Sequence, residues 1–218
     1  MATTTAADGT TIEFDDHPST ATFRDATSRD ATFRDATSRD ATSTDATPVI
    51  LVHGITESAA SWEPLIGRLA AHRRVVAMDL RGHGRSGTAD RYDLEAMAGD
   101  VAAVSAALDL DRPHLVGHSL GGAVVSAAGA AFPVSSVVNV DQSLQLDAFK
   151  EQLVGVEAQL RDPEAFPLVI QGLFELMAGD KISPAEMARV NLARRTDQEV
   201  VLGVWELILS VPANEIAA

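Results

Sequence analysis

The stretch HLVGHSLGG, residues 114–122, constrains the fold of this chain most, because an apolar run ends there in a G-x-S-x-G pattern. The pattern predicts a buried strand, a sharp turn at Ser119, and a helix of small side chains over residues 123–131. Gly117 and Gly121 leave room for the turn, which is expected to hold the serine in a strained backbone conformation. The serine hydroxyl would then stand clear of the sheet, as in a nucleophile elbow.

The same turn predicts a place where negative charge is stabilised. The amide of Leu120, at the start of the helix, would point toward an oxyanion formed beside Ser119, and the helix N-terminus adds a partial positive charge. In a chain with 15 glycines the G-x-S-x-G pattern alone is a weak signal, and the strand–turn–helix context strengthens it. The alternative is a glycine-rich helix start at which Ser119 is an ordinary N-cap.

Apolar runs alternate with helical patterns on both sides of this turn. The predicted strands cover residues 49–52, 74–78, 114–116 and 136–140, and the predicted helices cover residues 58–72, 94–108 and 123–131. Because the strands are apolar at nearly every position, each is expected to be buried on both faces of a parallel sheet. The alternation predicts an α/β fold with a mostly parallel sheet, helices on both faces and right-handed crossovers.

The two ends of the chain depart from this alternation. A turn after Asp8 leads into a short strand with Ile12 and Phe14 on one face, and we expect this strand at the sheet edge. After residue 143 the pattern becomes wholly helical, which predicts a four-helix cap or lid. The four predicted helices cover residues 146–160, 163–177, 184–195 and 197–209.

A nearly perfect repeat of the units ATFRD and ATSRD fills residues 21–47. A period of five residues builds a continuous apolar face on neither a helix nor a strand, so we expect a solvated loop or disordered insert that the fold does not need. The predicted organisation is therefore an N-terminal strand region over residues 1–20, the insert over 21–47, the α/β core over 48–143 and the helical cap over 144–218.

Composition excludes several classes of function. The formal net charge is −14, and Lys150 and Lys181 are the only lysines, which argues against binding nucleic acid or an anionic membrane. The chain has no cysteine and no cluster of His, Asp and Glu at metal-ligand spacing, so we expect neither a metal nor another cofactor. The sequence from Met1 lacks a signal-peptide pattern, which favours a cytoplasmic protein. Gly82-x-Gly84-x-x-Gly87 follows the second apolar run and does not favour nucleotide binding.

Three motifs in order resemble those of the α/β-hydrolase fold family, in its serine-nucleophile branch with a helical cap. They are HGIT from His53, DLRGHGRS from Asp79 and GHSLGG from Gly117, and the resemblance extends from about residue 48 to residue 218. It implies that Ser119 is the nucleophile and that the amides of Leu120 and Ile55 form the oxyanion hole.

The resemblance also implies structural roles and a pocket. His53 and Gly54 would shape the loop that carries the second amide, while Gly117, His118 and Gly121 would form the elbow. The cap would line an apolar acyl or alcohol pocket. The apolar side chains expected to line this pocket are Leu153, Val156, Leu160, Phe166, Leu173, Phe174, Leu176 and Trp205.

The chain departs from the family pattern after the cap, where the family normally has two more strands, an acid and a catalytic histidine. No histidine follows Ser119. The six histidines, each with an ordinary structural explanation, are His17, His53, His72, His83, His114 and His118. Asp141 is a candidate acid, and the alternative is a strand-end aspartate that binds local amides. Asp79 is expected to stabilise its loop.

The sequence therefore predicts hydrolysis of a small ester, thioester or lactone through an acyl-serine intermediate in the complete form of the protein. The partner would be a small molecule with an apolar acyl or alcohol group. The alternative is a C-terminally truncated chain or pseudo-enzyme that binds a ligand or partner without turnover. Without further strands, residues 136–140 would form an open sheet edge, and self-association into a homo-oligomer is then expected.

Overall fold

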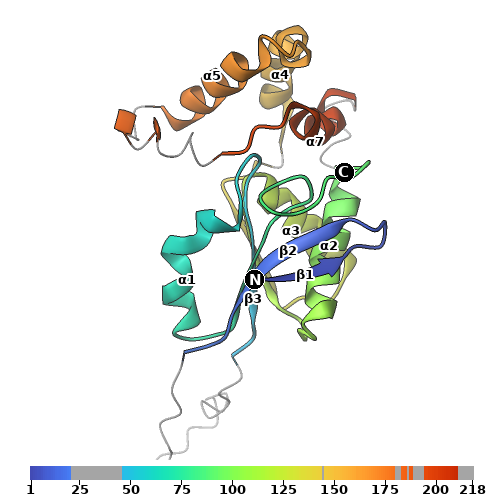
Figure 1. The fold of residues 1–218 in the computed structure, drawn as a ribbon, viewed down its shortest axis with the longest axis vertical. Coiled ribbons are helices and arrows are strands. Elements are labelled where there is room, and N and C mark those ends of the chain that lie inside the picture. Colours follow the sequence, from blue (N-terminus) through green and yellow to red (C-terminus); the bar gives the residue numbers. More distant parts are fainter. Residues whose placement is uncertain (21–45, 144, 180–182, 186, 189–193, 211–218) are drawn as a thin grey trace, which may run out of the picture.

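The computed structural model describes residues 1–20, 46–143, 145–179, 183–185, 187–188 and 194–210. These residues form a six-stranded sheet with the strand order β1-β2-β4-β3-β5-β6 and helices on both faces (Figure 1). The strands are β1 (Ala2–Thr5), β2 (Thr11–His17), β3 (Val49–Val52), β4 (Val75–Met78), β5 (His114–His118) and β6 (Ser136–Val140). The helices are η1 (Ala59–Trp62), α1 (Glu63–Ala70), α2 (Leu94–Ala107), α3 (Leu120–Ala131), α4 (Asp147–Arg161), α5 (Phe166–Ala178) and α7 (Gln198–Ser210).

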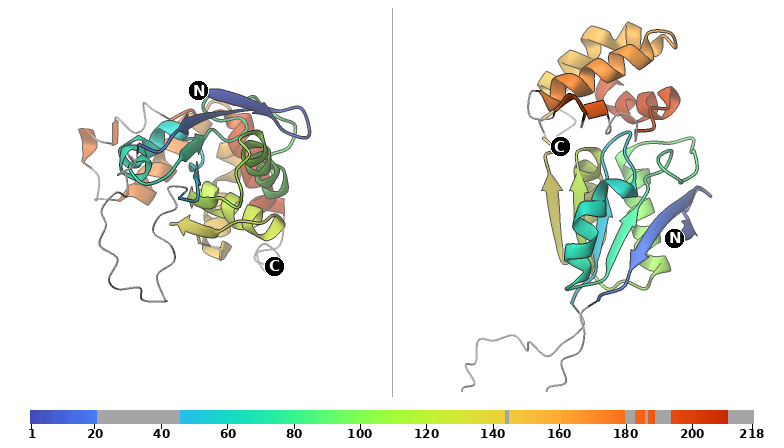
Figure 2. Two further views of the ribbon diagram at one scale, coloured as in Figure 1. Left: turned by 90° about the horizontal axis from the view of Figure 1, so that it is seen from below. Right: turned by 60° about the vertical axis from the view of Figure 1, so that its left-hand side comes forward.

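The central strands are buried because helices cover both faces of the sheet. Every residue of β3 and β4 is buried, and β3, β4, β5 and β6 run parallel, as predicted. Ile50 and Val52 pack into the larger hydrophobic cluster, which includes side chains of α2 and α3. Val49 and Leu51, on the other face, pack with Trp62 of η1. The sequence alternates between two apolar faces, and each face has its own helical layer (Figure 2).

The strand that carries Ile12 and Phe14 does not lie at the sheet edge, contrary to the prediction. Both side chains are buried as expected, but β2 pairs antiparallel with β4 on one side and with β1 on the other. β1 forms the edge instead. Its sequence ATTT has no apolar alternation, and it is held by backbone pairing with β2, so the hydrophobic pattern gave no sign of it.

Helix boundaries differ from the prediction by two residues or more at four places, one of which is the start of α3 at Leu120 instead of residue 123. The segment predicted as one helix over residues 58–72 consists of η1 followed by α1, which ends at Ala70. Helix α5 begins at Phe166 instead of residue 163, with Pro167 in its first turn. Within residues 184–195, residues 184–185 and 187–188 are helical and Arg194 and Arg195 are not, while 186 and 189–193 lie outside the described residues.

The C-terminal helices α4, α5 and α7 lie over the end of the sheet to which the parallel strands point (Figures 1 and 2). Most of the apolar side chains predicted to face a pocket there are buried or partly buried in the larger cluster. The buried ones are Leu153, Leu160, Phe166, Phe174 and Trp205. Leu176 is 69% exposed, so its inclusion in the predicted lining was wrong. It lies on the outward side of α5, which the sequence alone did not distinguish from the inward side.

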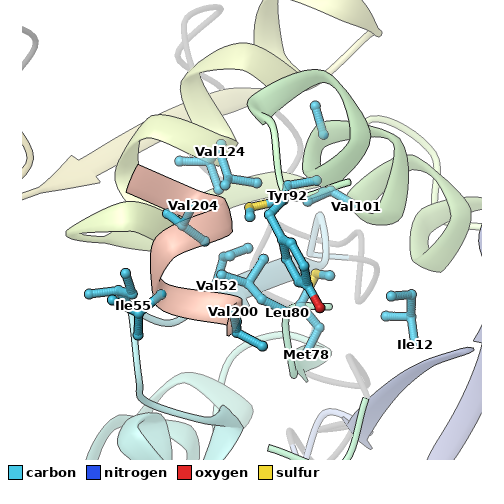
Figure 3. Packing of buried hydrophobic residues seen from close by; sticks show 14 of the residues in the cluster. Ile12, Val52, Ile55, Met78, Leu80, Tyr92, Val101, Val124, Val200 and Val204 are labelled. Carbon is cyan, nitrogen blue, oxygen red and sulfur yellow. The ribbon is translucent and has the colours of Figure 1, made fainter. Parts of the chain in front are cut away.

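Helix α7 joins these helices to the core of the sheet. Val200 and Val204 on α7 point toward Ile55, Leu80 and Tyr92 in the loops of the core (Figure 3). The loop after β4 and the C-terminal helices are therefore packed against each other. Of the predicted insert, residues 21–45 lie outside the described part of the chain. None of the described helices is long and apolar enough to cross a membrane.

β6 forms the second edge of the sheet and is exposed, whereas the sequence predicted a buried strand. Val138 is 47% exposed and Val140 is 39% exposed. Helix α3 covers the opposite face, where a Cβ on Gly129 would collide with Val137. The strand is as apolar as a central one, but among the described residues it pairs on one side only, with β5. The expectation of an open edge at residues 136–140 is confirmed for the described chain.

We expect the 218-residue chain to self-associate at micromolar concentration through β6, because an exposed apolar edge offers unpaired backbone groups to another strand. Analytical ultracentrifugation and binding of 8-anilinonaphthalene-1-sulfonate measure this. Val138→Lys should reduce both signals, and Val154→Lys, at an exposed valine of α4, is the matched control. A monodisperse, dye-negative wild-type protein would contradict the prediction.

Candidate active site

Ser119 lies between β5 and α3 in the strained conformation that the sequence predicted. Its φ is 50° and its ψ is −123°, a region that residues other than glycine rarely occupy. The Ser119 N–H donates to the carbonyl of Val140 at 2.9 Å, and its own carbonyl accepts from Gly122 at 2.7 Å. The strain is therefore held by the end of β6 on one side and by the first turn of α3 on the other.

Two glycines make this turn sterically possible. A Cβ on Gly117 would collide with the carbonyl of Gly121, and a Cβ on Gly121 would collide with the carbonyl of Val52. It would also lie 2.6 Å from the carbonyl oxygen of His53. The first turn of α3 thus packs directly on the backbone at the end of β3, as the small residues of the motif predicted.

The two amides predicted to face an oxyanion lie in adjoining segments. Leu120 is the first residue of α3, and Ile55 lies in the loop after β3. No acceptor for either N–H is found among the described residues. A Cβ on Gly54, which precedes Ile55, would lie 3.2 Å from the Cβ of Ser119, so this loop approaches the elbow closely. The role of both amides stays a prediction.

His53 is a buried structural residue, as expected. Its Nε2 accepts the N–H of Leu80 at 3.0 Å, so Nδ1 carries the proton and donates to the carbonyl of Gly54 at 2.7 Å. Burial lowers the pKa of His53, although the hydrogen bond to Gly54 partly opposes this. The side chain therefore ties the loop after β3 to the loop after β4 and has no ring nitrogen left for proton transfer.

Asp79 stabilises the loop after β4, as predicted. Its Oδ1 accepts the N–H of Ala59 at 2.6 Å, and its Oδ2 accepts Nε of Arg85 at 2.7 Å. Arg85 also pairs with Asp15 of β2, at 2.9 Å between Nη2 and Oδ2. The side chain is 1% exposed. Asp79 is fully occupied by these bonds, which leaves it no part in positioning a catalytic base.

His83 belongs to the same loop and is also buried. Its Nδ1 lies 2.8 Å from the carbonyl oxygen of Arg81, and its Nε2 is buried with no hydrogen-bond partner among the described residues. The ring centroid is 5.4 Å from that of His53. Burial, reinforced by the neighbouring His53, lowers the pKa of His83 to about 4. The imidazole is therefore held neutral near pH 7.

We expect the free energy of unfolding to fall as the pH drops from 6.5 to about 4, because the unfolded chain protonates His83 in this range and the folded chain does not. The loss from this one group is about 3 kcal/mol. Urea unfolding at pH 7 and pH 4.5 measures it. His83→Asn, whose amide can replace the Nδ1 donor, should flatten the slope, while His72→Asn, at an exposed position, should not. Equal slopes in all three proteins would refute the assignment.

His118 forms a contact that the sequence analysis did not foresee. Its Nδ1 lies 3.3 Å from Oε2 of Glu57, and the same oxygen accepts the N–H of Gly54 at 3.1 Å. The hydrogen bond to Glu57 raises the pKa of His118. Burial alone would raise the pKa of Glu57, but the bond to His118 lowers it. Glu57 thus links the elbow to the loop that carries Ile55.

Asp141 follows β6 in a left-handed conformation, with φ of 64°, and is exposed. Its charge contributes to the raised pKa of His118, after the larger effect of Glu57. Among the described residues, no side chain hydrogen-bonds to the Ser119 hydroxyl, and the structure brings neither His17, His72 nor His114 into the site. The role of Asp141 as the acid stays a prediction.

A second unforeseen residue is Arg194, which lies in the segment between the helical residues 187–188 and α7. The next residue, Arg195, donates its N–H to the carbonyl of Thr56 at 3.0 Å. This segment is separated from Thr56 by about 140 positions of sequence, so no local pattern could place it at the loop after β3.

The described residues also contain no group of three or more His, Asp or Glu side chains suited to a metal ion.

The sequence profile described as alpha/beta hydrolase fold matches residues 47–202, more than half of the chain. The chain belongs to the α/β-hydrolase fold family. Among solved structures, it is similar to an esterase from Exiguobacterium antarcticum, with a TM-score of 0.70 and 20% identity over 98% of this chain and 75% of the esterase. It is also similar to an enol-lactonase from Burkholderia xenovorans, with a TM-score of 0.68 and 20% identity over 96% and 74% of the two chains.

Sequence relatives include 2-(acetamidomethylene)succinate hydrolase from Mesorhizobium japonicum, which is 32% identical over 62% of this chain and 51% of that protein. Another is 2-hydroxy-6-oxo-2,4-heptadienoate hydrolase from Pseudomonas putida, 38% identical over 39% and 33% of the two chains. The chain spans between about a quarter and a half of the length of the curated relatives it matches.

Proposed function

We propose that Ser119 is the nucleophile of a hydrolase that cleaves a small ester, thioester or lactone in the complete form of the protein. The observation that carries the proposal is the backbone of Ser119, held at φ 50° between a parallel strand and a helix N-terminus. Such strain is retained where the surrounding structure enforces it, and it presents the hydroxyl at the carboxyl end of the sheet, where ligands bind in open α/β folds.

The proposed chemistry is acyl transfer to serine. The Ser119 oxygen attacks the substrate carbonyl carbon while its proton passes to a base, and the carbonyl oxygen becomes an oxyanion facing the amides of Ile55 and Leu120. Collapse of this intermediate expels the alcohol, thiol or ring oxygen, which takes up a proton. Water then releases the acid by the reverse sequence. The C-terminal helices would act as the cap over an apolar acyl or alcohol group.

The names of related proteins support a hydrolytic reaction on small molecules. The two sequence relatives are named as hydrolases of a succinate derivative and of a heptadienoate, and one structural neighbour is named as an enol-lactonase. These proteins share only part of their length with this chain, so their substrates support the reaction class and not a particular compound.

The second candidate function is binding without turnover. It is favoured by the positions of the histidines near the site. His53 and His83 are buried, and His118 directs Nδ1 to Glu57. A chain of this kind could bind an ester or its products while leaving the acyl-transfer step without a positioned base.

The test of Ser119 is labelling by a fluorophosphonate, followed by intact-mass spectrometry. We expect one adduct, formed slowly, that disappears in Ser119→Ala. Ser126→Ala is the matched control, because Ser126 lies two turns along α3 and its hydroxyl bonds the carbonyl of Gly122 at 2.7 Å. An adduct that persists in Ser119→Ala, or none in the wild-type protein, would overturn the proposal.

A further inference from the structure

Arg194 is a partly buried cation that forms no ion pair with any carboxylate among the described residues. Other described arginines lie in ion pairs with carboxylates, namely Arg74, Arg81, Arg85, Arg91 and Arg161. Nε and Nη1 of Arg194 are buried, and neither has a hydrogen-bond partner among the described residues. Burial accordingly lowers the pKa of Arg194, while the charge of Glu57 partly opposes the shift. Buried donors on a charged group are costly unless they are paired, so this arrangement requires an explanation.

The guanidinium is held in a fixed orientation by Phe174 of α5. Its Cζ lies 3.7 Å from the centroid of the Phe174 ring, which is itself 6% exposed. Stacking on the ring occupies one flat face of the guanidinium and leaves its edges available. A guanidinium can form bidentate hydrogen bonds with a carboxylate along two edges, through Nε and Nη2 or through Nη1 and Nη2. Each of these edges contains one of the unpaired donors.

Arg194 lies in a segment that is anchored close to the elbow at Ser119. Arg195 donates its N–H to the carbonyl of Thr56 at 3.0 Å and its Nη1 to the carbonyl of Gly84 at 3.2 Å, so the chain at Arg194 is anchored beside the loop of Ile55. The charge of Arg194 lowers the pKa of His118, which directly precedes Ser119. The guanidinium is therefore within electrostatic range of the elbow.

The carboxylate whose charge acts on Arg194 is that of Glu57, and it already accepts other hydrogen bonds. Oε2 of Glu57 accepts the N–H of Gly54 and lies within hydrogen-bond distance of His118, and no hydrogen bond joins Glu57 to Arg194 among the described residues. A planar anion from outside the chain would satisfy the free donors of Arg194. The chain has a net charge of −14, so its overall field repels anions. An anion is therefore expected to bind only where a local cation such as Arg194 attracts it.

We propose that Arg194 binds a carboxylate of the small molecule that occupies the Ser119 site. This inference rests on the proposed function and narrows its substrate class to esters, thioesters or lactones that also bear a carboxylate. The neutral acyl part would lie against the apolar side chains of α5 and α7, and the carboxylate would replace the missing anion beside Phe174. The contact is a binding contact and does not require Arg194 to touch the reacting atoms.

The first experiment measures binding without turnover, in the full chain carrying Ser119→Ala. The probes are the monomethyl esters of succinate, glutarate and adipate, each compared with its neutral dimethyl ester by isothermal titration calorimetry. We expect at least one monoester to bind about tenfold or more tightly than its diester, the usual effect of a charge-assisted hydrogen bond. Equal affinities for all three pairs would overturn the proposal.

Three variants assign the effect to Arg194. Arg194→Met keeps the aliphatic contact with Phe174 and should abolish the preference for the monoester, whereas Arg194→Lys should retain only part of it. Arg68→Gln, at an exposed arginine of α1, changes the net charge equally and should leave the preference intact. Because the orphaned donors are lost, the thermal midpoint of Arg194→Met should not fall. A preference that survives in Arg194→Met would refute the assignment.

The second experiment places the anion relative to the serine. In the wild-type protein, the tighter monoester should slow fluorophosphonate labelling of Ser119, and it should lose this effect in Arg194→Met. Binding that depends on Arg194 but leaves labelling unchanged would show that the two sites are separate and would overturn the proposal. If Ser119 is never labelled, its proposed role as the nucleophile is refuted. The calorimetry alone then decides whether Arg194 binds carboxylates.

Discussion

Replacing Gly121 by alanine is expected to destabilise the fold by about 3 kcal/mol, the upper end of the usual cost of overpacking. The added Cβ would collide with the carbonyl of Val52 and lie 2.6 Å from the carbonyl oxygen of His53. Both atoms belong to the backbone at the end of β3, so no side chain can rotate away. The strand and the first turn of α3 would have to separate, which also shifts the elbow at Ser119.

The thermal midpoint should fall by about 10 °C for a domain of this size, measured by circular dichroism. The matched control is Gly99→Ala in the interior of α2, where an added Cβ meets nothing within 4 Å. That change should raise stability by about 0.5–1 kcal/mol, because alanine favours the helix. If both variants unfold at the same temperature, the close approach of α3 to β3 is not as tight as described. The labelling of Ser119 should slow in Gly121→Ala alone.

The central fold could be predicted from the sequence because its strands are apolar on both faces and its motifs are local. β3, β4 and β5 were each expected within two residues of their observed ends, and the strained turn at Ser119 followed from Gly117 and Gly121. The edges could not be predicted in the same way. β1 is a polar strand held by backbone pairing, and β6 is an apolar strand whose exposure depends on what flanks it.

The residues of the candidate site likewise fall into those that local motifs predict and those that only long-range contacts reveal. Ser119, Leu120 and His53 belong to short motifs in which neighbouring residues fix one another. Glu57 and Arg194 make contacts with segments distant in the sequence, Glu57 with His118 and Arg194 with Phe174 of α5. A sequence pattern reports periodicity and local turns, so a lone glutamate or arginine gives no signal until its partners are known.

The 218-residue chain is expected to hydrolyse esters far more slowly than a typical enzyme turns over its substrate, which is on the order of 10 per second. A serine hydroxyl is a weak nucleophile near pH 7, and a positioned imidazole must remove its proton and later protonate the leaving group. Among the described residues no imidazole hydrogen-bonds to Ser119. Oxyanion stabilisation and binding alone leave a rate about 10³-fold above the uncatalysed reaction in enzymes whose triads have been dismantled.

The assay uses p-nitrophenyl acetate, with Ser119→Ala as the control for non-specific hydrolysis. Turnover of several per second that is lost in Ser119→Ala would contradict the prediction and would require a base within the chain. His118 would then be the first candidate, because His53 has both ring nitrogens bonded, and His83 is buried with a pKa lowered to about 4, which makes it a weak base. Because Nδ1 of His118 faces Glu57, Nε2 of His118 would have to act as the base. Glu57→Gln and His118→Asn should then each abolish that activity. Activity that survives both changes would exclude this pair and leave the base to be sought outside the described residues.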